Sequence, residues 1–309
     1  MPIRPLCPEL ALIAEKELNE DPKRIESDIQ HIREWISKQP HLHARTDDQW
    51  IVTFLRGCKY SLERTKEKID LYYSMRSLAP EIFFHLKHTD PKFMEILESG
   101  AYLLLPKLAA PNGQRIFFAK PSLLDSEKYK MMDVFAVTNV MQRIMLIDDD
   151  NTVVAGSRSV MDMEGLNMSF FMQMTPSMMR KMTVYTQEAM PLRFKGGHYI
   201  NVGSGFEKIY GIMKSFLNEK IKSRLHVHNT NHEELYKHVP KEILPAEYGG
   251  NGGTTQEIVD YWKKKIQEYS AWLEEDMQYR TDESKRPGKP RSAEEMFGTD
   301  GSFRQLDFD

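Results

Sequence analysis

The first hundred residues carry apolar side chains at helical spacing. The clearest stripe recurs every three or four positions, at Ile25, Ile29, Ile32 and Ile36. It ends before Pro40, and Asp21 followed by Pro22 predicts where the helix begins. Aspartate accepts hydrogen bonds from free backbone amides, and proline fits the first helical turn.

Two more helices follow in the same segment. The polar run 46–48 (TDD) begins one, with Trp50 and Phe54 facing inward, and Ser61 precedes another, with Ile69 and Tyr72 on its buried side. The pattern predicts a small helical bundle over residues 1–95, with no chemistry of its own.

The pattern changes near Ala101, where short apolar runs begin to alternate with helical stretches. Strands are expected at 101–105, 115–119, 153–163, 198–202 and 225–227, and helices at 133–146, 175–190 and 205–217. This alternation predicts an α/β fold with crossover connections. The glycine-rich run 249–253 (GGNGG) ends this domain, which we place at residues 96–250.

Residues 251–309 are expected to form a C-terminal helix and a tail. A charged helix is predicted from about Thr255 to Met277. The following run 285–290 (KRPGKP) indicates a mobile tail, from which three apolar side chains could dock back onto the body: Phe303, Leu306 and Phe308.

Composition places the chain among globular proteins, with 40% apolar and 28% charged residues. The net charge of −3 gives no overall field that would attract nucleic acid. No apolar run approaches the roughly 20 residues of a membrane span, and the N-terminus has no signal-peptide core. Cys7, in an N-terminus expected to be mobile, and Cys58 make a disulfide framework improbable. We therefore expect a cytoplasmic protein.

Motifs for catalysis are weak. His226 and His228 flank one residue on a predicted strand, so both imidazoles share a face, and His232 lies nearby. This pair lacks a further ligand at metal-binding spacing. No nucleophile elbow or P-loop occurs. We expect no enzyme activity, no cofactor and no metal.

Methionine is concentrated in one segment. Nineteen methionines occur in the chain, and nine of them lie between Met161 and Met190. The helices predicted at 133–146 and 175–190 are apolar on two faces, and flexible methionine side chains suit a cavity of irregular shape. A filled core fits the same spacing, so the pattern leaves both possibilities open.

Glycines and basic residues surround the helix predicted at 205–217. Gly203 and Gly205 at its start would suit a hinged lid, although an ordinary packed helix has the same apolar stripe. Nearby, Lys220 and Arg224 lie one turn apart, and Arg193 and Lys195 alternate in an extended segment. If the two pairs converge they form a phosphate-sized site, and if they do not they are solvated surface charge.

Five segments together resemble the CRAL-TRIO family, in the family's order. Residues 54–60 (FLRGCKY) resemble F-L-R-A-R/C-x-F/Y, and 162–165 (DMEG) match D-x-E-G. Residues 191–201 (PLRFKGGHYIN) match P-L/V-R/K-x-R/K-x-x-H-x-I/V-N. Residues 214–221 (KSFLNEKI) resemble K-P-F-L-x-x-K-I/L, and 244–250 (LPAEYGG) match L-P-x-E-Y-G-G. The similarity is greatest to the branch that carries tocopherol and retinaldehyde.

The resemblance implies a helical module, a lipid-binding α/β domain and a mobile lid helix over 205–217. It implies a hydrophobic ligand that is tocopherol-, retinoid- or carotenoid-like. The ligand-binding positions expected from it are Phe135, Thr138, Gln142, Ser157, Ser159, Met161, Met174, Met182, Tyr185, Thr186, Met190, Phe194, Ile209, Ile212 and Phe216. Several of these are more polar or more adaptable than in the tocopherol carriers, so the ligand can differ.

The resemblance also implies a partner membrane. In the tocopherol-carrying branch, basic residues near the lid bind a phosphoinositide headgroup, such as phosphatidylinositol bisphosphate. The matching positions here are Arg193, Lys195, Lys220 and Arg224, all cationic, which implies transient membrane contact. Two further basic positions of that branch correspond to Cys58 and Glu67.

Other functions remain open. The chain could exchange phospholipids, or act as a scaffold whose partner surface is switched by lipid. A hydrolase or isomerase of the bound lipid would need a nucleophile with a base, and no such pair is evident.

Overall fold

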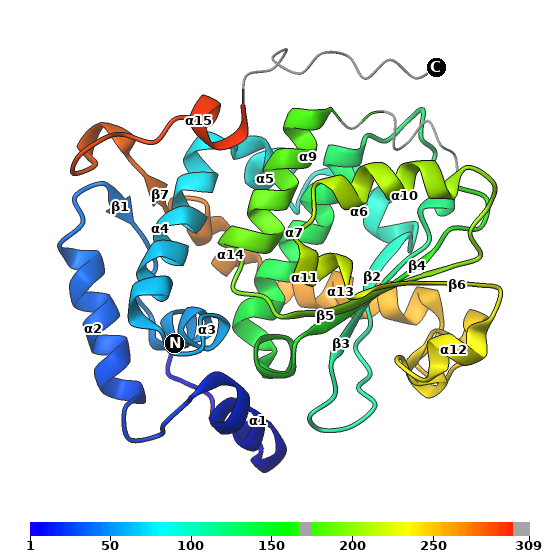
Figure 1. Ribbon diagram of the computed structural model, residues 1–309, viewed down its shortest axis with the longest axis horizontal. Coiled ribbons are helices and arrows are strands. Elements are labelled where there is room, and N and C mark those ends of the chain that lie inside the picture. The colour runs from blue at the N-terminus through cyan, green and yellow to red at the C-terminus, as the bar shows by residue number, and fades with distance from the viewer. Residues whose placement is uncertain (167–172, 174, 299–309) are drawn as a thin grey trace.

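The structure, a computed structural model, describes residues 1–166, 173 and 175–298 (Figure 1). Its N-terminal part is helical, as the apolar stripes predict. The helices are α1 (Pro8–Leu18), α2 (Ile25–Ser37), α3 (Asp48–Gly57), α4 (Leu62–Leu78), α5 (Pro80–Phe84) and α6 (Pro91–Glu98).

Two predictions about this module are wrong. Helix α2 begins about one turn after Asp21, whose carboxylate instead accepts a hydrogen bond from the Lys23 amide in a turn (3.0 Å). The N-terminus is not mobile either: α1 buries Leu10, Ala14 and Leu18 against the segment at Val154. In both cases a contact made in the folded molecule overrides the local signal.

A five-stranded sheet follows, which confirms the α/β prediction. Its strands are β2 (Tyr102–Leu104), β3 (Arg115–Ala119), β4 (Ser157–Asp162), β5 (Phe194–Ile200) and β6 (Leu225–Asn229). They lie in sequence order across the sheet; β2 is antiparallel to β3, and the other pairs are parallel. The strand expected at 153–163 begins later, because residues 151–155 form a π-helical turn.

The register of the sheet fixes what each face carries. One row across it consists of Phe117, Ser159, Gly197 and Leu225. The next row points to the opposite face, because side chains alternate along a strand, and consists of Phe118, Val160, His198 and His226. The first face lies beneath α10 (Phe206–Ser215), and the second carries the histidines.

Helices connect the parallel strands. They are α7 (Met131–Asp148), α9 (Pro176–Thr183), which continues into a π-helical turn (Val184–Ala189), α10 (Phe206–Ser215) and α11 (Glu219–Lys222), while α12 (His232–Tyr236) follows β6, the last strand of the sheet. Helix α7 packs on both sides, as its two apolar faces predict: Val137 and Met141 lie in one core, and Phe135 and Leu146 lie in another with the N-terminal module. Neither α7 nor any other described helix is long and apolar enough to cross a membrane.

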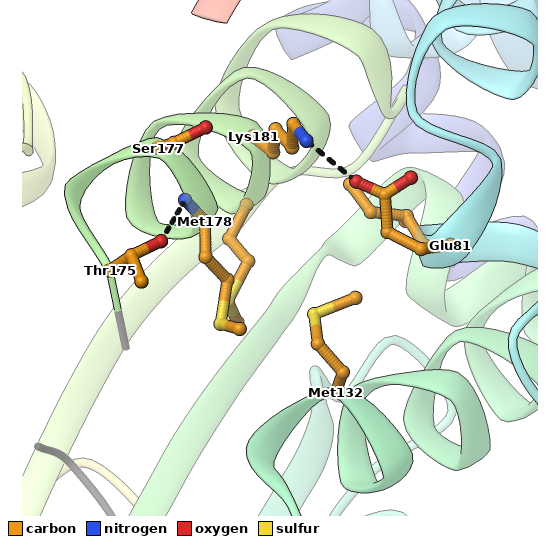
Figure 2. A pocket seen from close by; sticks show the side chains of 8 residues that line it. Glu81, Met132, Thr175, Ser177, Met178 and Lys181 are labelled. Atoms are coloured by element: carbon orange, nitrogen blue, oxygen red, sulfur yellow. Dashed lines mark hydrogen bonds and ion pairs between the residues drawn. The ribbon is translucent and has the colours of Figure 1, made fainter. Parts of the chain in front are cut away.

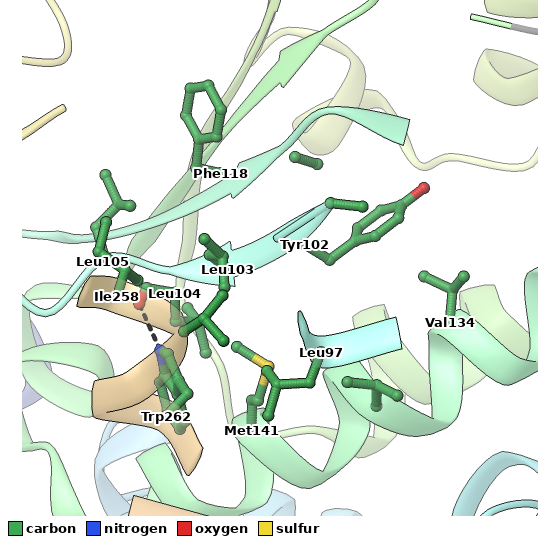
Figure 3. Close-up of a cluster of buried hydrophobic side chains, with 14 of the residues drawn as sticks. Leu97, Tyr102, Leu103, Leu104, Leu105, Phe118, Val134, Met141, Ile258 and Trp262 are labelled. Carbon is green, nitrogen blue, oxygen red and sulfur yellow. Dashed lines mark hydrogen bonds between the residues drawn. The ribbon is translucent and has the colours of Figure 1, made fainter. Parts of the chain in front are cut away.

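Side chains of the C-terminal segment pack into both of the hydrophobic cores that α7 contacts. Helices α13 (Thr255–Glu268) and α14 (Ser270–Asp276) replace the single helix expected up to Met277 and meet at Tyr269. In Figure 3 the Trp262 ring lies beside Leu104, whose carbonyl oxygen accepts a hydrogen bond from the indole N–H (2.7 Å).

The tail as far as residue 298 is docked, so the prediction that it is mobile is wrong. Strand β7 (Arg280–Thr281) pairs with β1 (Leu42–His43), and α15 (Ala293–Phe297) buries Phe297. Arg286 donates two hydrogen bonds of 2.8 Å to the Asp70 carboxylate on α4. The basic run that suggested mobility is therefore held to α4 through Arg286, while Lys285 and Lys289 pair with nearby acids. Three tail residues, Phe303, Leu306 and Phe308, lie outside the described residues.

Candidate functional site

Helix α10 covers one face of the sheet. Its Phe206 and Tyr210 rings contact the Tyr199 ring on β5, with centroids 5.3 and 5.5 Å apart. Met161 on β4 and Met213 on α10 belong to the same apolar cluster. We call these side chains, with the sheet residues beneath α10, the lid layer.

The lid layer is incompletely buried. Met161, Phe194, Tyr210, Met213 and Leu225 are only half-buried, so the edge of the layer reaches solvent. Gly203, Gly205 and Gly211 are exposed, and a Cβ built on any of them would meet no atom within 4 Å. Helix α10 therefore covers the sheet only in part, and its glycines face solvent.

The sheet face beneath α10 carries small and polar side chains as well. A Cβ on Gly197 would lie 2.9 Å from Leu225 Cδ2 and 3.2 Å from both Phe194 Cζ and Ser159 Oγ, which places those three side chains on one face. Ser157, two residues before Ser159, shares that face and is also half-buried. The layer thus offers hydroxyl groups among apolar surface.

A second hollow is lined by methionines. It lies between α5, α7 and α9, has a volume of about 150 Å³, and is bordered by Ile82, Met132, Met178 and Met182 among others. In Figure 2, Met132 and Met178 form two of its walls, and the ion pair between Lys181 and Glu81 (2.8 Å) spans its edge. A space of this size holds about one aromatic ring. A longer lipid would require the surrounding helices to move.

The structure divides the expected ligand-binding residues among several places. Ser157, Ser159, Met161 and Phe194 lie on the sheet face under α10, where Ile212 and Phe216 of the α10 segment are half-buried, and Met182 borders the methionine hollow. Phe135, Thr138, Tyr185 and Met190 are buried in the protein, whereas Gln142 is half-buried and Thr186 is exposed. Met174 and the side chain of Ile209 lie outside what the structure describes.

Tyr185, one of the expected ligand-binding residues, lies in the core. It is fully buried, its ring contacts the rings of Phe83 and Phe135, and its hydroxyl accepts a hydrogen bond from Asn139 (2.6 Å). These contacts hold the π-helical turn against the N-terminal module. Its place as a ligand contact stays a prediction.

The four expected phosphoinositide-binding cations lie near one another. Burial and then the charges of Arg224, Lys59, Arg64 and Arg193, in that order, lower the pKa of the Lys220 ammonium group. Lys195 and Arg193 share one carboxylate, that of Glu17 on α1. We call these cations, Lys59 and Arg64 included, the basic patch.

Glu17 occupies part of the basic patch. Its carboxylate accepts hydrogen bonds from Arg193 (2.5 Å) and Lys195 (3.2 Å), and the Arg193 bond is the main cause of its lowered pKa. Within the described chain, no carboxylate forms an ion pair with Lys220, Arg224, Lys59 or Arg64. The basic patch therefore has one half already neutralised and one half available to an external anion.

Sequence reasoning missed Arg64 and did not assign Lys59. Both come from the N-terminal module and approach Lys220 only in the folded chain. Lys59 follows α3 with a positive φ of 55°, in a tight turn that a resemblance based on aligned positions does not detect.

The predicted histidine pair also lies where expected. The rings of His226 and His228 are stacked 6.1 Å apart on β6, on the face opposite the lid layer. Across the described ranges, no group of three or more histidine, cysteine or acidic residues has an arrangement that would hold a metal ion.

A helical module followed by a mixed sheet with a half-buried apolar helix on one face is an architecture that lipid-binding α/β domains share. Family models agree with this class. Residues 108–250 match the CRAL/TRIO domain, and residues 21–93 match the Pinta-like, UBA domain. The chain belongs to the CRAL/TRIO family of lipid-binding and lipid-transfer proteins.

Curated relatives cover most of the chain. It is 30% identical to "Alpha-tocopherol transfer protein-like" of Homo sapiens over 250 residues, which is 80% of this chain and 72% of that protein. It is 30% identical to Clavesin-2 of Rattus norvegicus over 246 residues, which is 79% of this chain and 75% of the relative. Among solved structures, that of Sfh5 has a TM-score of 0.45 at 13% identity, covering 80% of this chain and 89% of that one.

Proposed function

We propose that this protein is cytoplasmic, binds a hydrophobic small molecule beneath α10 and carries it between membranes. The observation that carries the proposal is the half-buried apolar lid layer under α10, a helix that begins at exposed glycines. A tocopherol-, retinoid- or carotenoid-like ligand suits a layer that combines aromatic rings, methionines and a few hydroxyl groups. The name of the relative "Alpha-tocopherol transfer protein-like" supports this ligand class.

The energetics favour a gated carrier. A ligand that buries about 400 Å² of apolar surface is stabilised by about 10 kcal/mol relative to water, as an upper bound. Release into water is therefore slow, and a membrane supplies the apolar destination. The methionine hollow of about 150 Å³, between α5, α7 and α9, is smaller than such a ligand and could hold only part of it. Because α10 covers the lid layer, loading and release beneath it require α10 to move.

The basic patch is the proposed binding site for the membrane surface. Lys220 and Arg224 lie within ten residues of the end of α10, and neither pairs with an acid among the described residues. A phosphoinositide headgroup would bring several phosphates to these cations. Each basic residue near an anionic surface contributes about 1 kcal/mol of attraction. Contact at the basic patch then favours an open α10.

The double substitution Lys220→Ala with Arg224→Ala tests this role. We expect binding to vesicles that contain phosphatidylinositol bisphosphate to weaken by about 30-fold, since two cations are removed. Transfer of ligand to those vesicles should slow, while ligand binding in solution stays unchanged. Fluorescence transfer and vesicle sedimentation measure both quantities.

The control is Lys237→Ala with Lys264→Ala, which removes two exposed cations from α12 and α13. It should leave transfer as it is in the natural chain. If transfer is the same in both double variants, the basic patch does not act at the membrane.

Gly197→Val tests the ligand layer itself. The added side chain would enter the lid layer against Leu225 and Phe194, whose ends must shift, so ligand affinity should fall at least about tenfold and the free energy of unfolding by about 1 to 3 kcal/mol. Ligand titration by tryptophan quenching, together with thermal unfolding, separates the two effects. Unchanged affinity in a folded variant would place the ligand elsewhere.

A further inference from the structure

Four imidazole rings gather on the sheet face opposite the lid layer. They belong to His198 on β5, His226 and His228 on β6, and His238 just after α12. Their ring centroids are 5.0 to 6.1 Å apart, and His198 Nδ1 lies 2.9 Å from His228 Nε2. We call them the histidine cluster.

The histidine cluster has the wrong geometry for a metal. The rings of His198, His226 and His228 lie at interplanar angles of 12° to 21°, and His198 Nδ1 is in hydrogen-bond contact with His228 Nε2, so the nitrogens do not point at one common position. Metal ligands instead point their lone pairs at one position. No metal-holding group occurs in the described part of the chain, the cluster included.

A half-buried arginine adjoins the cluster. Arg158 on β4 donates from Nε to Gln114 Oε1 (2.5 Å), and its Nη1 lies 3.3 Å from His198 Nε2. It forms no ion pair with any described carboxylate, in contrast to the buried Arg56, Arg76, Arg115 and Arg143. A Cβ on Gly196 would come within 2.6 Å of Arg158 Nη1, so the guanidinium lies directly on the strand.

Beside this arginine is a hollow of about 280 Å³. Its walls come from three parts of the chain: the loop before β3, with Asn112 and Gln114; β4, with Arg158; and the segment after α12, with His238. No acidic side chain lines it. A fixed positive charge, amide groups and an imidazole thus surround a space open to small solutes.

We propose that Arg158 and His238, backed by the histidine cluster, form an anion site that takes a phosphate group. A guanidinium without a carboxylate partner has free donors that match phosphate oxygens, and imidazolium groups add further donors. The volume exceeds that of a bare phosphate, so a phosphomonoester on a small headgroup fits as well as the free ion. The site lies on the opposite sheet face from the lid layer and does not depend on the proposed carrier function.

Binding at this site should strengthen at lower pH. Burial is the first cause that lowers the pKa of His198, to about 3, and it also lowers the pKa of His228 and His238, with neighbouring imidazoles adding to the effect. The other charged groups that act on the cluster are Arg158, which has Arg224 near it, Glu234 on α12, and Lys237 just after α12. A bound anion favours the protonated imidazoles, so the two processes reinforce each other.

Calorimetric titration of the full chain with inorganic phosphate tests the proposal. Arg158→Gln should weaken binding by about tenfold or more, and His238→Asn should weaken it by severalfold. His238 is exposed, so that variant keeps the fold even if Arg158→Gln loses stability. Sulfate, whose charge is constant over this range, should bind more tightly at pH 5.5 than at pH 7.5.

Two controls locate the anion. Lys264→Gln removes an exposed cation of α13 that does not line the hollow and should bind phosphate normally. Lys220→Ala, in the basic patch, should also retain phosphate; if it loses phosphate while Arg158→Gln keeps it, the proposal is overturned and the anion binds at the basic patch. Vesicles of phosphatidylcholine with phosphatidic acid distinguish the source: Arg158-dependent sedimentation indicates a lipid headgroup, and binding of inorganic phosphate alone indicates the free ion. No Arg158-dependent binding of either also overturns the proposal.

Discussion

At the scale of single residues, Glu17 holds a position that an anionic headgroup would take. Its carboxylate neutralises Arg193 and Lys195, while Lys220 remains exposed. Glu17→Gln should therefore strengthen binding to phosphoinositide vesicles by about twofold to fivefold, the range set by an exposed ion pair of up to about 1 kcal/mol. Vesicle sedimentation at several lipid concentrations gives the change.

The matched control is Glu15→Gln, on the same helix and exposed without a partner among the described residues. It should change vesicle binding less than Glu17→Gln does. Equal effects from the two variants would mean that only the net charge matters and that Glu17 has no special position.

At the scale of elements, the start of α10 depends on one glycine. Gly205 has a φ of 88°, which an L side chain adopts at a cost of about 1 to 2 kcal/mol, although a Cβ would meet no atom. Gly205→Ala should loosen the first turn of α10, so its amides should exchange faster and ligand should leave sooner. Hydrogen exchange with and without ligand measures this.

Gly203→Ala serves as the comparison, because Gly203 also has open space but does not require a positive φ. It should leave α10 exchange nearly unchanged. If both alanine variants behave alike, the backbone at Gly205 does not control the helix.

The sequence predicted the elements that have local signals and missed those that depend on contacts between distant parts of the chain. Each strand of the sheet was predicted because its apolar run and flanking turns are local signals, and β3 was placed at the observed residues. The pairing of β1 with β7 was missed, since each is two residues long and the two are far apart in the chain. The docked tail was missed for the same reason: Arg286 finds Asp70 only after folding.

For the candidate site, the resemblance supplied four cations, and the structure adds Lys59 and Arg64 to them. The sequence predicted two of the four members of the histidine cluster, His226 and His228. His198 and His238 join it from another strand and from beyond α12, which no spacing along the sequence reveals.

At the scale of the whole molecule, Asp276 ties three parts of the chain together. It is fully buried in α14 and pairs with Arg45, with Arg76 of α4 and with Arg143 of α7, at 2.7 to 2.9 Å. Asp276→Asn should lower the free energy of unfolding by about 3 to 5 kcal/mol, because it leaves buried guanidinium groups uncompensated. Urea unfolding measures the loss, and Glu274→Gln, at an exposed position two residues earlier in α14, should be nearly neutral.

The charge of Asp276 should make the protein less stable at acidic pH. Although burial opposes ionisation, the three arginines hold the pKa of Asp276 at about 2, below its ordinary value of 3.8. The folded state therefore binds this proton less tightly than the unfolded state does, so the stabilisation is full above pH 3.8 and is lost as the pH falls toward 2. Asp276→Asn should remove that part of the acid unfolding; an unchanged acid profile would contradict the role.

We propose that a hydrophobic ligand occupies the lid layer. The most direct test is organic-solvent extraction of the purified protein, after isoprenoids, retinoids and phospholipids have been offered in competition, followed by mass spectrometry of what remains bound. The account predicts one isoprenoid- or retinoid-like molecule per chain, and less of it in Gly197→Val. A stoichiometric phospholipid, or no retained lipid at all, would contradict it.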